Sequence, residues 1–174
     1  MITTLLIDAY EERDVGIFDV PGAYLYACLP DDKHIVMVLR DDFDGIMCNV
    51  NLEYNKHIIT LKNRKRVLYL KVQRAIYGCI ESALCWYNLY SDTLKNEGFT
   101  INPYDECVAN KIIDGKQCTI TWYVDDNKIS HVDSKVVDTV LDIIETHFGK
   151  LVITRGKTFN FLEMKINITK EKMI

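Results

Sequence analysis

Two adjacent carboxylates constrain the fold of this chain more than any other feature of its sequence. Asp125 and Asp126 lie between two short β-prone runs, residues 118–122 and 128–132. Such an arrangement predicts a tight hairpin with both acids at its tip. Because neighbouring like charges repel, the pair is costly unless a cation lies between them. The pattern therefore favours a site that holds Mg²⁺ against a phosphate.

Apolar spacing on either side of the hairpin predicts two amphipathic helices, at residues 81–97 and 134–148. Their expected buried faces are Ala83, Leu84, Tyr87, Tyr90 and Leu94 in the first helix, and Val136, Val137, Val140, Leu141, Ile144 and Phe148 in the second. Strands are predicted at residues 15–18, 35–39, 67–72, 107–113, 117–123, 128–132, 151–154 and 159–168. Residues 40–65 are polar and predict no regular element.

The order of these elements predicts an α+β fold with the split β-α-β-β-α-β (ferredoxin-like) plan. In this plan an antiparallel sheet carries two helices on one face. The last two strands are expected to form a hairpin through a turn at residues 155–157, with a bulge near Leu162-Glu163. The plan also places the end of the first strand beside the acid hairpin, so Asp19 should approach Asp125 and Asp126.

Length and composition are those of an ordinary globular chain. The 174 residues are 48% apolar and 26% charged, which predicts a single domain over residues 1–174. Apolar runs are all shorter than the roughly 18 residues of a membrane span, and no basic region precedes the apolar start. We therefore expect neither a membrane partner nor secretion. The six cysteines form no C-x-x-C pair and indicate free thiols in a reducing compartment.

The charge balance bears on nucleic-acid binding. A net charge of −4 argues against a self-sufficient nucleic-acid binder, because phosphate contacts need a positive face. One segment is locally basic, and it contains Lys62, Arg64, Lys65, Arg66, Lys71 and Arg74. Two interpretations of this segment stay open: a solvated turn and strand edge, or a patch that contacts a phosphate backbone.

Three carboxylates from two neighbouring strand ends suit nucleotidyl transfer. That reaction needs charge neutralisation at the attacking and leaving oxygens, which two Mg²⁺ ions roughly 3.5–4 Å apart supply. Asp19 and Asp125 would bridge the ions, and Asp126 would complete the cluster. No protein nucleophile is needed, because the substrate brings its own hydroxyl. Each residue alone is a weak signal, since an acidic pair in a turn is usually solvated; the combination carries the prediction.

Five motifs occur in order along the chain: Asp19-Val20-Pro21-Gly22-Ala23-Tyr24-Leu25, Ala75 to Tyr87 with its Tyr77-Gly78 helix start and Trp86, Asn102-Pro103-Tyr104-Asp105, the Tyr123-Val124-Asp125-Asp126 box, and Phe161-Leu162-Glu163-Met164. Together they resemble the motifs of the reverse transcriptases of copia-type retrotransposons. The resemblance runs from about Asp14 to Ile168. It implies the palm of an RNA-dependent DNA polymerase at residues 14–168, with the fingers mostly missing upstream and with thumb and RNase H absent.

The resemblance also implies roles for individual residues. Catalysis falls to Asp19, Asp125 and Asp126, and contact with two Mg²⁺ or Mn²⁺ ions to Asp19, Val20, Asp125 and Asp126. Tyr24, Gly78 and Glu81 would contact the nucleotide, with Tyr24 as the steric gate against a ribose 2′-OH. Tyr123 and Glu163 would lie at the primer and template. The implied partners are an RNA or DNA template with its primer, deoxynucleoside triphosphates, and the integrase and RNase H segments of a Pol polyprotein.

Four departures from the family pattern predict a feeble or inactive polymerase, and one of them is Ile80, which stands where the family has a basic residue. Glu81 replaces a Gln, so an amide that donates and accepts becomes a carboxylate that only accepts. Glu163 replaces a Gly, and only 18 residues precede Asp19. Two alternatives stay open: a non-catalytic remnant or co-opted binding and assembly module with a palm fold, and an unrelated palm-like nucleotidyl enzyme such as a cyclase. For localisation, the cytoplasm and the nucleus both agree with the resemblance.

Overall fold

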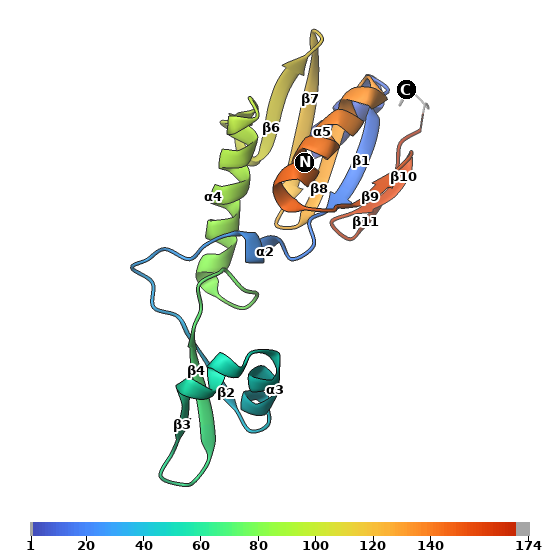
Figure 1. The fold of residues 1–174 in the computed structure, drawn as a ribbon. Helices are drawn as coiled ribbons and strands as arrows, with labels where there is room; N and C mark the ends of the chain where they lie inside the picture. Colours follow the sequence, from blue (N-terminus) through green and yellow to red (C-terminus); the bar gives the residue numbers. More distant parts are fainter. Residues whose placement is uncertain (1, 170–174) are drawn as a thin grey trace.

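The computed structural model describes residues 2–169, so residue 1 and residues 170–174 of the expected 1–174 domain lie outside the described part. The fold is α+β, with an antiparallel six-stranded sheet in the order β5-β6-β7-β8-β1-β9. Figure 1 shows α5 lying across this sheet. The strands of the sheet are β1 (Asp14–Asp19), β5 (Thr100–Asn102), β6 (Asp105–Ile113), β7 (Lys116–Tyr123), β8 (Asp126–His131) and β9 (Val152–Arg155).

Two helices connect strands that are distant in sequence. The helix α4 (Ile80–Asn96) precedes the β5-β6-β7-β8 meander, and α5 (Ser134–Phe148) leads from β8 to β9. The strand β1 lies between β8 and β9 and is antiparallel to both. As a result, the C-terminal end of β1 meets the turn between β7 and β8.

Both helices pack on one face of the sheet. In α5 all six residues of the predicted buried face are buried, from Val136 to Phe148. In α4 the predicted face is confirmed at Tyr90 and Leu94 and is wrong at Leu84, which is 62% exposed, whereas Trp86 is buried against Phe148. The residues that α4 buries are Ser82, Trp86, Tyr90, Ser91 and Leu94. The indole ring buries more apolar surface than a leucine, so the helix is rotated to bury Trp86.

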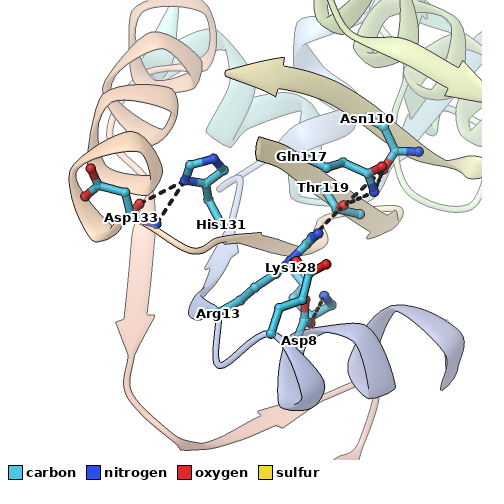
Figure 2. A network of polar contacts seen from close by, with 9 residues as sticks. Asp8, Arg13, Asn110, Gln117, Thr119, Lys128, His131 and Asp133 are labelled. Atoms are coloured by element: carbon cyan, nitrogen blue, oxygen red, sulfur yellow. Dashed lines mark hydrogen bonds and ion pairs between the residues drawn. The ribbon is translucent and has the colours of Figure 1, made fainter. Parts of the chain in front are cut away.

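The other face of the sheet is covered by a helix that the sequence did not predict, α1 (Ile2–Tyr10). Its Asp8 forms an ion pair with Lys128 of β8, and both side chains are 0% exposed. Arg13, which follows the helix, donates a hydrogen bond to Thr119 of β7. Figure 2 shows these polar side chains meeting between α1 and the strands. The helix is thus held by buried charges rather than by an apolar stripe alone.

The C-terminal strands differ from the prediction. The expected hairpin is wrong, because β9 pairs with β1, whereas β10 (Thr158–Phe161) pairs with β11 (Met164–Asn167). The expected bulge is also wrong, because Leu162 and Glu163 form a two-residue turn with φ of 49° and 61°. Both central residues therefore have the left-handed conformation of a type I′ hairpin turn. Phe159 and Phe161 of this hairpin pack with Val15 on the face opposite to α5.

Residues 36–71 form a separate three-stranded sheet in the order β2-β4-β3, set apart below α4 (Figure 1). Its strands are β2 (Val36–Arg40), β3 (Ile58–Thr60) and β4 (Arg66–Lys71). The prediction of no element at residues 40–65 is wrong, because α3 (Phe43–Val50), the 3₁₀ helix η1 (Leu52–His57) and β3 lie there. These elements are short, and an ion pair between buried Asp44 and Arg66 supports them. Within residues 2–169, every helix is too short or too polar to cross a membrane.

Candidate active site

The acids meet where β1 ends beside the turn between β7 and β8. Asp19 lies directly opposite Asp126 in the β1–β8 register, and Tyr123 lies opposite Asp126 in the β7–β8 register. Val124 and Asp125 form the two-residue turn between these strands. The expected approach of Asp19 to the acid pair is therefore seen in the strand pairing. Because alternate residues share a face, Asp126 lies on the same face as Lys128, opposite to α5.

The three acids influence one another electrostatically. The pKa of Asp19 is raised by partial burial and by the negative charges of Asp125 and Asp126. The pKa of Asp126 is raised by partial burial, by Asp125 and by Glu163. Such mutual repulsion is relieved by a hard divalent cation, so the donor set fits Mg²⁺ or Mn²⁺. Among residues 2–169, no three His, Cys, Asp or Glu side chains form a ready-made metal site as they stand.

The acid turn is strained and is held by α4. Val124 has φ of 56°, a left-handed conformation that a β-branched residue rarely adopts. The indole N–H of Trp86 donates to the carbonyl oxygen of Val124 at 2.6 Å. The side-chain amide of Asn127 donates to the carbonyl oxygen of Asp125. These two bonds fix the carbonyl of the strained residue and that of the residue after it.

A further tyrosine belongs to the site. The hydroxyl of Tyr77 donates to Oδ2 of Asp125 at 3.0 Å, and its ring packs on the ring of Tyr24 with centroids 4.6 Å apart. Burial and this hydrogen bond raise the pKa of Tyr77 to about 12. Sequence analysis used Tyr77 only as part of a motif and assigned it no role. The sequence signal that could have identified Tyr77 as a site residue is its position directly before a glycine at a predicted helix start.

The remaining predicted site residues have different positions. Tyr123 is 63% exposed at the end of β7. Glu81 lies half-buried in the first turn of α4, and Gly78 precedes that helix with φ of 92°. Glu163 lies in the β10–β11 turn, close enough to Asp126 to raise its pKa. Val20 is fully buried after β1. The structure thus brings Glu163 to the acids, while the assigned roles stay predictions.

The basic side chains of residues 62–74 differ in their surroundings, because some have partners and others are exposed. Arg66 pairs with Asp44, and Arg74 donates to the carbonyl oxygen of Tyr26. Lys62, Arg64 and Lys65 lie exposed between β3 and β4, and Lys71 lies exposed at the end of β4. The choice between a solvated turn and a phosphate-contacting patch stays open for these four residues.

Comparison with known proteins finds solved structures with a similar fold. No known family model matches the chain, and no curated protein matches it. Among solved structures, apo telomerase from Candida tropicalis has a TM-score of 0.50 at 13% identity, with 97% of this chain and 34% of that chain covered. Telomerase from Candida albicans in complex with the TWJ fragment of telomeric RNA gives 0.50 at 13%, with 97% and 32% covered.

The chain therefore shares a polymerase-like fold with part of these telomerase structures. It spans about a third of the length of the telomerase structures it matches. At this level of identity the likeness concerns the fold alone.

Proposed function

We propose that this chain is the palm-bearing part of an RNA-dependent DNA polymerase of the copia-type reverse transcriptase kind. The observation that carries the proposal is the β1–β8 register, which sets Asp19 opposite Asp126 and beside Asp125. The polymerase-like fold supports the same conclusion. The copia-type assignment rests on the sequence motifs, above all the Tyr-Val-Asp-Asp box and the Asp19 segment.

Each site residue then has a task. Asp19, Asp125 and Asp126 bind two Mg²⁺ or Mn²⁺ ions, which when bound neutralise charge on the attacking and leaving oxygens. Tyr24 lies where its ring, packed on Tyr77, selects against a ribose 2′-OH. Gly78 and Glu81 border the incoming nucleotide. Tyr123 and Glu163 border the primer and the template.

The order of the strands supports a palm. Strands β7, β8, β1 and β9 are neighbours in that order, and α4 and α5 both pack on the face opposite to Lys128. This is the arrangement expected of the split β-α-β-β-α-β plan. The acids lie at one end of this four-stranded unit, where a primer end is accessible to them.

The test combines cation binding with primer extension. Purified wild-type protein and Asp125→Asn are titrated with Mn²⁺ and then assayed with an RNA template, a DNA primer and deoxynucleoside triphosphates. We expect Mn²⁺ binding that is lost in Asp125→Asn, and weak extension by the wild type. Equal Mn²⁺ binding by the two proteins would refute the site. Steady extension by the wild type would refute the prediction of a feeble enzyme.

A second candidate is a non-catalytic binding or assembly module that keeps this fold. One observation favours it: Glu163 stands near Asp126 and adds negative charge beside the acids. A fourth carboxylate repels the phosphates of a primer or a nucleotide. On this alternative, the protein binds Mn²⁺ weakly at best, and no template supports extension even after Glu163→Gly restores the family residue.

A further inference from the structure

The hydrogen bond from Tyr77 to Asp125 joins two parts of the chain that are distant in sequence. Tyr77 lies in the segment between β4 and α4, and Asp125 lies at the tip of the β7–β8 hairpin. The hydroxyl oxygen is 3.0 Å from Oδ2 of the carboxylate. This contact takes one oxygen of an acid that the proposed function assigns to cation binding.

We propose that Tyr77 is a positioning residue that holds Asp125 closed, and that it must release this carboxylate before Asp125 gives the same oxygen to a cation. The inference rests on the proposed function, because it concerns the same three acids. It adds Tyr77 to the site, and it adds an order of events in which the hydrogen bond is released before the cation binds Asp125.

The backbone just before Tyr77 is fixed by two hydrogen bonds of Ile76, one at its N–H and one at its carbonyl oxygen. The hydroxyl of Ser82 accepts from the backbone N–H of Ile76 at 3.0 Å and donates to the carbonyl oxygen of Ile76 at 2.6 Å. Ser82 is fully buried in the first turn of α4. The segment that carries Tyr77 is therefore anchored to α4, and Tyr77 reaches Asp125 from a fixed base.

The side chain of Tyr77 is directed by a second contact. Its ring packs on Tyr24 at a centroid distance of 4.6 Å and an interplanar angle of 50°. Tyr24 belongs to the short helix α2 (Ala23–Tyr26), which follows Asp19 closely in sequence. The hydroxyl is thus aimed at the acids by contacts with two elements of the site, which a randomly placed surface tyrosine would lack.

Tyr77 also has room to move away. Its side chain is 58% exposed. Gly78, the next residue, has φ of 92°, and a Cβ placed there would meet no heavy atom within 4 Å. The neighbour on its C-terminal side therefore leaves space around the side chain of Tyr77, although the backbone before it is anchored. Tyr77 is held by one hydrogen bond and by the contact with the ring of Tyr24. Its side chain is not enclosed by closely packed neighbours.

The hydroxyl hydrogen and a cation repel each other when both approach Oδ2 of Asp125, which has two lone pairs. A tyrosine hydroxyl presents a hydrogen with partial positive charge, and Oδ2 of Asp125 accepts it. A cation at that oxygen would meet this hydrogen at close range, so the hydrogen bond must break or turn. A hydrogen bond of this kind corresponds to roughly a two- to tenfold change in an equilibrium constant.

The test measures Mn²⁺ affinity by electron paramagnetic resonance of the free ion, in the full chain without nucleotide. Tyr77→Phe removes the hydroxyl and keeps a ring that packs on Tyr24. Tyr104→Phe is the matched control, because Tyr104 is 97% exposed and lies on a different loop. We expect Tyr77→Phe to bind Mn²⁺ roughly two- to tenfold more tightly than wild type, and Tyr104→Phe to bind like wild type.

Two further variants separate the possible failures. Asp19→Asn should abolish binding in the wild-type background, which ties the measured ion to the acids. Tyr77→Leu, which also lacks the hydroxyl, should shift affinity in the same direction as Tyr77→Phe. If the wild type binds Mn²⁺ through Asp19 but Tyr77→Phe binds equally or more weakly, the inference is overturned and the proposed function stands. If neither wild type nor Tyr77→Phe binds Mn²⁺, both are overturned.

Discussion

Replacing Lys128 with Met should lower the free energy of unfolding by about 3–5 kcal/mol at pH 7. Lys128 and Asp8 are both 0% exposed, and Nζ lies 2.5 Å from Oδ2. Met has similar length and no charge, so the cavity it leaves is small. The variant buries the carboxylate of Asp8 without its partner, and Oδ1 of Asp8 already lacks a hydrogen-bond partner among residues 2–169.

Proton uptake by the unpaired carboxylate sets the scale of this loss. A buried Asp side chain that loses its cation binds a proton instead, and carrying that proton at pH 7 costs about 4 kcal/mol. Burial already lowers the pKa of Lys128, which marks the desolvation of the pair. Removing both charges in Asp8→Leu/Lys128→Met should restore stability to within about 1 kcal/mol of wild type, or above it.

Urea denaturation of wild type, the two single variants and the double variant measures this cycle. We expect each single variant to lose several kcal/mol and the double variant to lose little. The loss in the double variant should therefore be far smaller than the sum of the two single losses. A loss below about 1 kcal/mol in Lys128→Met, or additive losses in the double variant, would refute the buried ion pair as the anchor of α1.

Three further changes probe the candidate site. Trp86→Phe removes the indole N–H that bonds Val124 and leaves a small void, so urea denaturation should detect a loss of about 2–4 kcal/mol. Asp19→Asn should raise the melting temperature at pH 7 but much less near pH 3. The raised pKa of Asp19 makes the native state bind more protons than the unfolded state, so wild-type stability falls as pH rises through that pKa. Glu163→Gly places a glycine at φ of 61° and removes a charge near Asp126, so stability should rise by up to about 1 kcal/mol and the pKa of Asp126, followed by NMR, should fall.

Local patterns predicted the parts of the fold that local physics determines. The buried face of α5 follows from apolar spacing at three and four residues, and the β6–β7 hairpin agrees with the strands predicted at residues 107–113 and 117–123. The approach of Asp19 to Asp126 followed from the order of the elements. In these cases the sequence pattern and the tertiary packing favour the same structure.

Non-local choices were beyond the sequence. The helix α1 presents Asp8 to the interior, and an acid on a buried face contradicts the amphipathic pattern on which helix prediction depends. Nothing in the sequence of β9 indicates that this strand pairs with β1. The β10–β11 turn uses two residues with positive φ, Leu162 and Glu163, and neither is a glycine. The sequence therefore suggested a bulge where the chain reverses.

The acid turn depends on α4 as much as on its own strands. Within ten residues, from Tyr77 to Trp86, the chain bonds Asp125, anchors Ile76 through Ser82 and bonds the carbonyl of Val124. Val124 has a backbone conformation that is unfavourable for a β-branched residue, and such strain persists only where surrounding contacts hold it. The helix start and the acid hairpin therefore form one structural unit. It follows that a β7–β8 hairpin without α4 would relax at Val124 and lose the relative position of Asp125 and Asp126.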